Sequence, residues 1–256
     1  MSSAAEMQLP YCVANAPVHH FPFPHMYVRD VFPNDFYRAL RENLPSPDAS
    51  KTLTSLGRVS DGYPESRLVF PLETQNIAGL REPARRFWQD LARWLRGQEF
   101  GSMMLGRFAP YLEQRFGAAY TQEFTNEALL VQDYTTYRLP PHTDSPQKVL
   151  ALLFYLPPDD RLSHLGTSSS LPKERGFVCE GHTHYPPEAF DRLVTMPYTP
   201  NSLLAFFKTS SSCHGVEPIV EKGVRRDLLL YDIRVHRPSV AETAPAAGPA
   251  NVRFTF

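Results

Sequence analysis

The sequence predicts an α+β domain in which a layer of helices packs against a β-sandwich or barrel. Apolar residues recur at helical spacing in the first half of the chain, whereas short β-rich runs bounded by Pro, Gly and Ser follow from residue 128. The 17 Phe and 12 Tyr are typical of a β-rich core, and the 25 Pro indicate many loops and strand ends. Helices and strands that come in separate blocks are typical of α+β domains.

The first half of the chain contains three candidate helices. One begins near Asn34 and carries an apolar stripe. A second follows Pro83, a residue favoured in a first helical turn, and ends at Gly97. A third is expected over residues 102–116. The stripe of the first helix contains Phe36, Leu40 and Leu44, and that of the second contains Ala84, Phe87, Trp88, Leu91, Trp94 and Leu95. These aromatic residues are expected to pack in the core, as their period indicates.

The predicted strands are short. An extended entry strand is expected over residues 20–28, and four further strands over residues 128–137, 148–156, 202–208 and 226–235.

The remaining segments are expected to be irregular. Residues 45–66 read as a long loop, and residues 158–200 as an insert that forms a lid or surface loop near the site where substrate binds. Residues 1–19 are expected to be an irregular lead-in and residues 238–256 a flexible Ala/Pro-rich tail. The domain is therefore predicted to span residues 20–237.

Composition excludes several classes of protein. A net charge of -1 argues against nucleic-acid binding through phosphate neutralisation. The longest apolar run, residues 149–156, is too short to cross a bilayer, and the first residues do not form a secretory signal. Cys12, Cys179 and Cys213 are widely spaced and show no disulfide framework, which favours a cytoplasmic protein.

A His-x-Asp pair and a distant histidine form a candidate metal site. One residue separates His142 from Asp144 in the sequence. In an extended backbone, residues i and i+2 project to the same side, so these two side chains can reach one ion. A fold that returns His214 to this pair would give two imidazoles and one carboxylate. Such a set suits Fe(II) and leaves coordination positions open, although the same ligands also bind zinc.

Two consecutive arginines follow the second histidine. A guanidinium group matches a carboxylate through two parallel hydrogen bonds, so Arg225 or Arg226 can anchor an organic acid. Strand alternation places the two side chains on opposite faces, and only one of them is expected to face the site.

These residues resemble the Fe(II)/2-oxoglutarate-dependent dioxygenases, especially the prolyl-hydroxylase-like branch. The resemblance covers residues 20–236. It is carried by PHTDS at 141–145, KVLALLFYLP at 148–157, NSLLAFF at 201–207 and HGVEPIVEKGVRRDLLLYD at 214–232, and the entry segment FPFPHMYVRDVFPNDFYRALRENLP at 21–45 is similar to that of the same branch.

The resemblance implies a fold, cofactors and roles. The fold is a double-stranded β-helix, a jelly-roll or cupin-like core, with N-terminal helices packed against the major sheet. The iron ligands are His142, Asp144 and His214, with 2-oxoglutarate and O2 as co-substrates. Arg225 follows Gly223-Val224 as in the family's Gly-x-Arg and is preferred for 2-oxoglutarate, with Arg226 as the alternative. Tyr155 and Tyr134 are candidate co-substrate contacts. A ligand carboxylate favours hydroxylation over halogenation.

The predicted function is oxidation of a small molecule. The chain is expected to hydroxylate, or otherwise oxidise, an unactivated C–H bond of a small, possibly amino-acid-derived substrate, releasing succinate and CO2. A protein or peptidyl hydroxylase and a non-oxidative metal-binding β-barrel protein are the alternatives. No nucleic-acid or membrane partner is expected, and the sequence leaves open whether the protein is a monomer or a homodimer.

Overall fold

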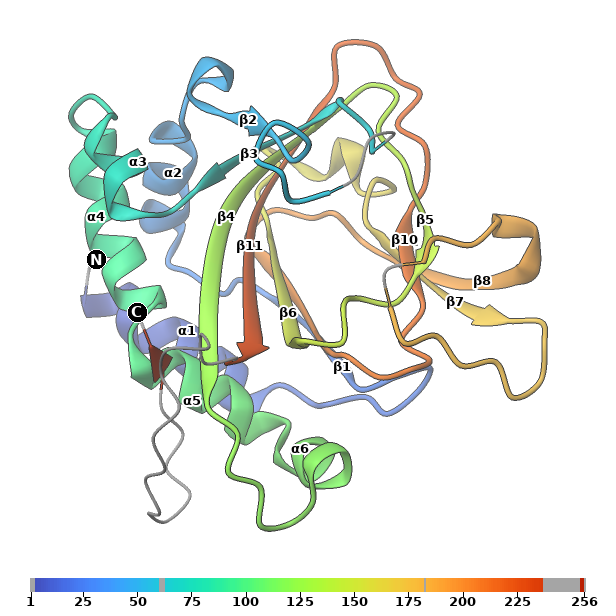
Figure 1. Cartoon of the computed structure of the whole chain (residues 1–256). Helices are drawn as coiled ribbons and strands as arrows, with labels where there is room; N and C mark the ends of the chain where they lie inside the picture. The colour runs from blue at the N-terminus through green and yellow to red at the C-terminus, as the bar shows by residue number, and fades with distance from the viewer. Residues whose placement is uncertain (1–2, 60–62, 182, 237–253, 256) are drawn as a thin grey trace.

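Two facing β-sheets, with helices on the outer side of the larger one, make up the fold (Figure 1). The computed structural model describes residues 3–59, 63–181, 183–236 and 254–255. Most of the segment predicted to be a tail, residues 238–256, lies outside the described residues. No described helix is long and apolar enough to cross a membrane.

The major sheet contains all five predicted strands. Its order is β1-β9-β6-β11-β4-β3-β2, with antiparallel neighbours throughout, and β12 pairs in parallel with β4. The strands are β1 (His25–Arg29), β2 (Lys51–Thr52), β3 (Arg67–Pro71), β4 (Phe124–Tyr134), β6 (Lys148–Tyr155), β9 (Ser202–Phe207), β11 (Arg225–Val235) and β12 (Phe254–Thr255).

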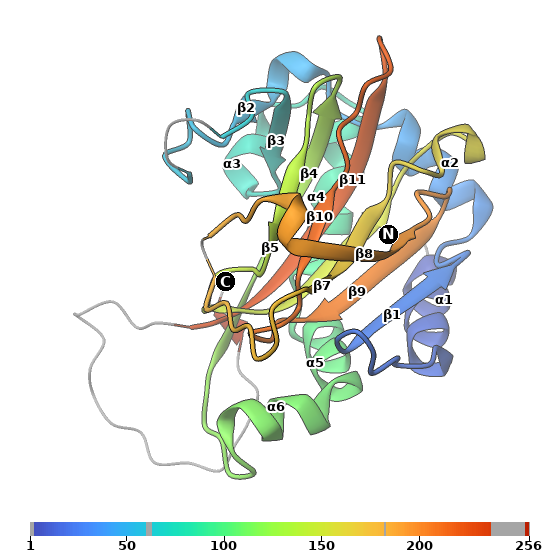
Figure 2. The same cartoon turned by 90° about the vertical axis from the view of Figure 1, so that its right-hand side faces the viewer.

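The minor sheet has the order β5-β10-β7-β8, and Figure 2 shows it in front of the major sheet. Its strands are β5 (Leu139–His142), β7 (Thr167–Pro172), β8 (Phe190–Met196) and β10 (His214–Val216). Residues 158–200 are therefore not only a lid or loop, because they supply β7 and β8. These strands are hard to recognise from sequence: β7 is mostly Ser and Thr, and β8 is largely exposed.

The helices cover the outer face of the major sheet (Figure 1). They are α1 (Ser3–Asn15), α2 (Asn34–Glu42), α3 (Thr74–Ala78), α4 (Ala84–Leu95), α5 (Gln98–Arg107) and α6 (Ala109–Phe116). Short 3-10 helices occupy Pro47–Ala49, Asp160–Leu162 and Pro187–Ala189. The first two predicted helices are confirmed as α2 and α4.

Two predictions about the helical half are wrong. The single helix expected over residues 102–116 is split at Phe108, because Pro110 lacks an N–H and cannot continue the helix before it. The lead-in of residues 1–19 is not irregular: Ser3–Asn15 form α1, which buries Ala5, Leu9 and Val13 at a spacing of four residues.

Strand alternation divides the core into two layers. On β11, Leu229, Tyr231 and Ile233 face the helices, whereas Leu228 and Leu230 face the minor sheet. The side chains between the two sheets therefore line the interior of the double-stranded β-helix, where the candidate site lies.

Candidate metal and co-substrate site

The minor sheet brings the two predicted histidines together. His142 ends β5 and His214 begins β10, and the two residues lie directly opposite each other in the antiparallel register. Their ring centroids are 4.4 Å apart. Asp144 follows two residues after His142, and one ligand atom from each of the three residues lies within 4.8 Å of the others. The three predicted metal-ligating side chains thus converge on one point.

Hydrogen bonds leave one free ligand atom on each residue. Nδ1 of His142 lies 3.0 Å from the carbonyl oxygen of Pro140, and Nδ1 of His214 lies 3.0 Å from that of Ser212. Because a carbonyl only accepts, both Nδ1 atoms donate and both Nε2 atoms present a lone pair. Oδ1 of Asp144 is 3.1 Å from Nζ of Lys148, while Oδ2 has no hydrogen-bond partner among the described residues. This donor set fits Fe(II).

Burial and neighbouring charge set the protonation of these groups. Burial, reinforced by His214, lowers the pKa of His142 to about 3, and burial also lowers the pKa of His214. Burial alone would raise the pKa of Asp144, but Lys148 and the two imidazoles hold it below its usual range. All three groups are therefore in their metal-binding forms at neutral pH.

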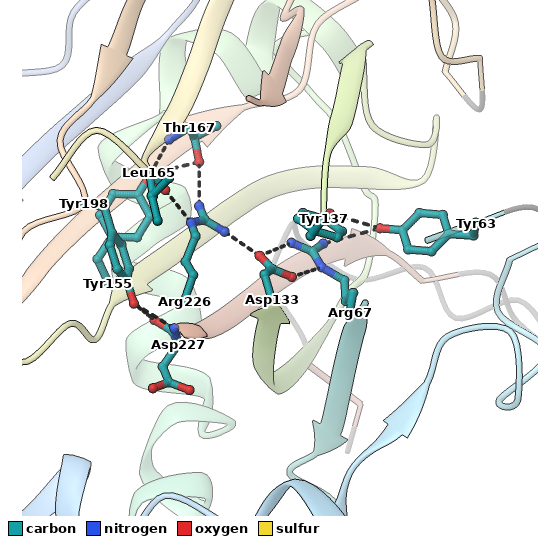
Figure 3. Close-up of polar contacts among 10 residues, drawn as sticks. All are labelled: Tyr63, Arg67, Asp133, Tyr137, Tyr155, Leu165, Thr167, Tyr198, Arg226 and Asp227. Atoms are coloured by element: carbon teal, nitrogen blue, oxygen red, sulfur yellow. Dashed lines mark hydrogen bonds and ion pairs between the residues drawn. The ribbon is translucent and has the colours of Figure 1, made fainter. Parts of the chain in front are cut away.

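A second polar group lies deeper between the sheets, around Arg226. Its side chain is fully buried, and it donates from Nε to the carbonyl of Leu165 at 2.5 Å and from a terminal nitrogen to Asp133 at 2.6 Å. Asp133 also accepts two hydrogen bonds from Arg67, at 2.6 and 2.9 Å. Figure 3 shows the Asp133 carboxylate between the two guanidinium groups.

This buried trio has a net charge of +1, from two guanidinium groups and one carboxylate. A buried excess charge is costly, so one further carboxylate bound beside Arg226 or Arg67 would complete the charge balance. Tyr155 lies beneath Arg226, with its ring centroid 5.7 Å from the guanidinium carbon. The Tyr155 hydroxyl donates to Oγ1 of Thr167 at 2.8 Å and accepts from the Thr167 backbone N–H at 3.2 Å.

One cavity connects the three candidate metal-ligating residues with Arg226. Its volume is about 280 Å³, and it is lined by both sheets, with His142, Asp144, His214, Arg67 and Arg226 on its wall. A ligand that reaches both the triad and Arg226 can therefore bind without crossing a packed layer.

Two predicted co-substrate residues lie elsewhere. Arg225 is the neighbour of Arg226 on β11, so its side chain points to the opposite face, where it pairs with Asp227 at 2.9 Å. Tyr134, its partner in the register, donates to Gln132 and does not line the cavity. Of the two arginines, Arg226 and not Arg225 lines the cavity, and the Gly-x-Arg spacing does not determine which side of the strand an arginine faces.

Among the charged residues of the cavity region that the sequence does not predict are Asp133, Lys148 and Arg67. Asp133 and Lys148 lie at the ends of apolar strands, and a charge at such a position is the one signal that marks them. Arg67 lies on β3, a strand that the sequence does not reveal. Its role depends entirely on the pairing of β3 with β4, which places Arg67 opposite Asp133.

Comparison with solved structures shows the fold of the chain. No family model and no curated protein sequence matches the chain. The structure of a prolyl hydroxylase from Trichoplax adhaerens matches with a TM-score of 0.50 at 13% identity, over 90% of this chain and 89% of that chain. This chain has the fold of the Fe(II)/2-oxoglutarate-dependent oxygenases. Within this oxygenase fold, His142, Asp144 and His214 form a facial-triad-like group.

Other solved oxygenase structures are similar at lower scores. A prolyl-4-hydroxylase from Pseudomonas putida matches with a TM-score of 0.49 at 16% identity, over 89% of this chain and 99% of that chain. HygX from Streptomyces hygroscopicus, solved with nickel and 2-oxoglutarate, matches with a TM-score of 0.45 at 16% identity, over 89% of this chain and 91% of that chain.

Proposed function

We propose that this chain is an Fe(II)- and 2-oxoglutarate-dependent oxygenase. In this proposal it hydroxylates, or otherwise oxidises, an unactivated C–H bond of a small molecule and releases succinate and CO2. The observation that carries the proposal is that one cavity holds both a triad with three free ligand atoms and a buried arginine. A metal site alone would not need Arg226, and an organic-acid site alone would not need the triad.

Each residue has a distinct part in this proposal. Nε2 of His142, Nε2 of His214 and Oδ2 of Asp144 hold Fe(II), which when bound supplies the redox chemistry that couples O2 to decarboxylation of 2-oxoglutarate. Arg226 replaces Arg225 as the anchor of the distal carboxylate. Tyr155 fixes the hydroxyl of Thr167, which also lines the cavity beside Arg226.

The size of the cavity favours a small substrate. Its volume of about 280 Å³ is shared with the co-substrate, which leaves room for a compact group rather than for a long segment of chain. A peptide substrate is the second candidate, because the structure of the Trichoplax adhaerens prolyl hydroxylase contains a bound peptide fragment of hypoxia inducible factor. Incorporation of one oxygen atom into a peptide or protein, detected by mass spectrometry, would favour that candidate.

The proposal predicts loss of metal-dependent properties in Asp144→Ala. Anaerobic addition of Fe(II) and 2-oxoglutarate to the wild-type protein should produce a weak visible charge-transfer band, and aerobic incubation should release succinate. Asp144→Ala should show neither, because a ligand is missing. The exposed carboxylate variant Asp191→Ala serves as the control and should behave like the wild type. Unchanged succinate release in a folded Asp144→Ala protein would contradict the ligand assignment.

The same samples distinguish an oxygenase from a non-oxidative metal-binding protein. Metal analysis that finds bound metal, together with no 2-oxoglutarate consumption under any substrate mixture, would favour this alternative over the oxygenase.

A further inference from the structure

A second charged group, which we call the outer polar cluster, lines the cavity away from Arg226. It consists of Arg58, Glu127, Lys148, Asp232 and Arg234, which come from β4, β6, β11 and the loop before β3. The side chains of Arg58, Glu127 and Arg234 are 32%, 23% and 34% exposed, whereas that of Arg226 is fully buried. The cluster therefore lies toward the open end of the cavity.

The cluster forms a chain of alternating charges that ends at the triad. Arg58 pairs with Glu127, and Glu127 lies 3.6 Å from Arg234. Arg234 is 3.3 Å from Asp232, and Lys148 lies 2.9 Å from Asp232 and 3.1 Å from Asp144. A group bound by this cluster is thus held next to a metal-ligating residue.

The two polar ends of the cavity are too far apart for one co-substrate. Asp232 pairs with Glu127 in the register, and Arg226 pairs with Asp133 six residues earlier on β11. Six residues of an antiparallel strand span ~20 Å. 2-Oxoglutarate has a five-carbon chain, about the length of two extended residues, or ~7 Å. If it binds between the triad and Arg226, as the proposed function requires, the outer polar cluster remains available for the substrate.

Three buried atoms of the cluster have no hydrogen-bond partner among the described residues, and one of them, Oε2 of Glu127, makes only the 3.6 Å ion pair with Arg234. The other two are Oδ1 of Asp232 and Nε of Arg234. The three atoms comprise two acceptors and one donor, and the pairing of Asp232 with Glu127 places the two acceptors on neighbouring strands. A complementary ligand must both donate and accept hydrogen bonds.

Charge narrows the class of ligand. The cluster has three cations, Arg58, Lys148 and Arg234, and they are balanced by three carboxylates, Glu127, Asp232 and the adjacent Asp144. An ammonium group would meet the neighbouring cations, and a carboxylate would meet Glu127 and Asp232, so either would add an uncompensated charge. Hydroxyl groups carry no charge, and each of them both donates and accepts.

We propose that the outer polar cluster binds a neutral, polyhydroxylated part of the substrate, of the sugar or cyclitol class, beside the triad. Hydroxyls of this group donate to Glu127 and Asp232 and accept from Arg234. This inference rests on the proposed function only in assigning the Arg226 end of the cavity to the co-substrate.

Ligand-observed NMR on the full chain, without metal or 2-oxoglutarate, tests the proposal. The probes are methyl α-glucopyranoside and myo-inositol, the zwitterions proline and lysine, and the anion propionate. The two hydroxylated probes should give saturation-transfer signals, and their affinity should fall at least about tenfold in Glu127→Gln, because a hydrogen bond to a charged acceptor is lost. The exposed variant Glu99→Gln is the control and should bind like the wild type.

Two further variants keep the test decisive. Asp232→Asn and Arg234→Gln should weaken the same probes in the same way, and circular dichroism checks that each variant is folded. Preferential binding of the zwitterions or of propionate through these residues would overturn the proposal. Absence of any signal from the hydroxylated probes would also overturn it.

Failure of the proposed function is recognised separately. If the hydroxylated probes bind in a Glu127-dependent manner but Fe(II) and 2-oxoglutarate give neither a visible band nor succinate, the oxygenase assignment fails and the binding site stands. If succinate is released but the hydroxylated probes do not bind, the oxygenase assignment stands and the proposed binding site fails.

Discussion

Arg226 connects the two sheets through its own hydrogen bonds. It lies on β11 of the major sheet, donates to Asp133 on β4, and reaches Leu165 and Thr167 next to and within the minor sheet. Fixed on three sides, the guanidinium group keeps one orientation, which suits it to hold a carboxylate without a loss of side-chain freedom on binding.

Replacing Arg226 should separate its role from that of its neighbour. Arg226→Gln is expected to raise the KM for 2-oxoglutarate by about 10- to 100-fold, because a charge-assisted hydrogen bond contributes about 1.5–3 kcal/mol. Asp133 keeps Arg67 as a partner, which limits damage to the fold. Arg225→Gln, the matched control on the opposite face, should leave the KM within about twofold. Succinate release against 2-oxoglutarate concentration measures both, and equal effects of the two variants would contradict the assignment.

Burial of His142 should make the metal-free protein sensitive to acid. Its pKa is about 3 in the folded chain and about 6.5 when unfolded, so the unfolded chain binds more protons between these values. This contribution to stability is fully present above pH 6.5 and is lost as the pH falls toward 3. Urea unfolding from pH 7.5 to 4 should show a shallower pH dependence in His142→Gln than in the wild type, by up to about 1.4 kcal/mol per pH unit. Identical slopes would contradict the buried neutral imidazole.

Single residues differ in how far the sequence predicts them. His142 and Asp144 are predictable because two-residue spacing in an extended segment fixes a shared side, and the structure places them with His214. Arg226 is not predictable in this way, because choosing it over Arg225 requires knowing which side of the strand faces the site. Register decides that side, and register depends on the partner strand.

At the scale of elements, a close backbone approach positions Asp144. The loop between β7 and β8 passes against the residues after β5: the Thr143 hydroxyl donates to the Cys179 carbonyl at 2.9 Å, and a Cβ at Gly181 would overlap the Asp144 carbonyl oxygen. Part of the segment predicted to be an insert thus supports the triad. The sequence does not reveal this, because the contact joins residues far apart in the chain.

Gly181→Ala should disturb the contact between the β7–β8 loop and Asp144. The added methyl group must push the backbone at Asp144, so metal affinity is expected to fall about 10- to 100-fold, as for loss of a partner that orients a ligand. Gly176 also has a positive φ, 75° against 119° for Gly181, but a Cβ there meets no atom within 4 Å. Gly176→Ala therefore controls for backbone strain and should keep wild-type affinity. Fe(II) or Zn(II) titration compares them, and equal affinities would exclude the clash as a cause.

At the scale of the whole molecule, the helices and the site lie on opposite faces of the major sheet. Leu229, Tyr231 and Ile233 of β11 pack under the helical layer, while Arg226 and Asp232 of the same strand line the cavity. The block order of helices and strands predicts that a helical layer packs against the β-sheets, but it does not predict which face of the major sheet holds the site. The sequence of α1 does not predict a helix in this layer, because Pro10 lies inside it. Its stability depends on burial of its apolar residues in the core rather than on local helix propensity.

The packing of α1 on this layer leads to a prediction about stability rather than activity. Leu9 is fully buried in the helix-side core, so Leu9→Ala should lower the free energy of unfolding by about 2–5 kcal/mol, through lost burial and the cavity left behind. Met7 lies on the same helix but is 67% exposed, and Met7→Ala should change stability by less than about 0.5 kcal/mol. Urea unfolding measures both. Because the cavity lies across the sheet, the metal affinity of folded Leu9→Ala should match the wild type, and a parallel loss of metal binding would show that the helical layer also shapes the site.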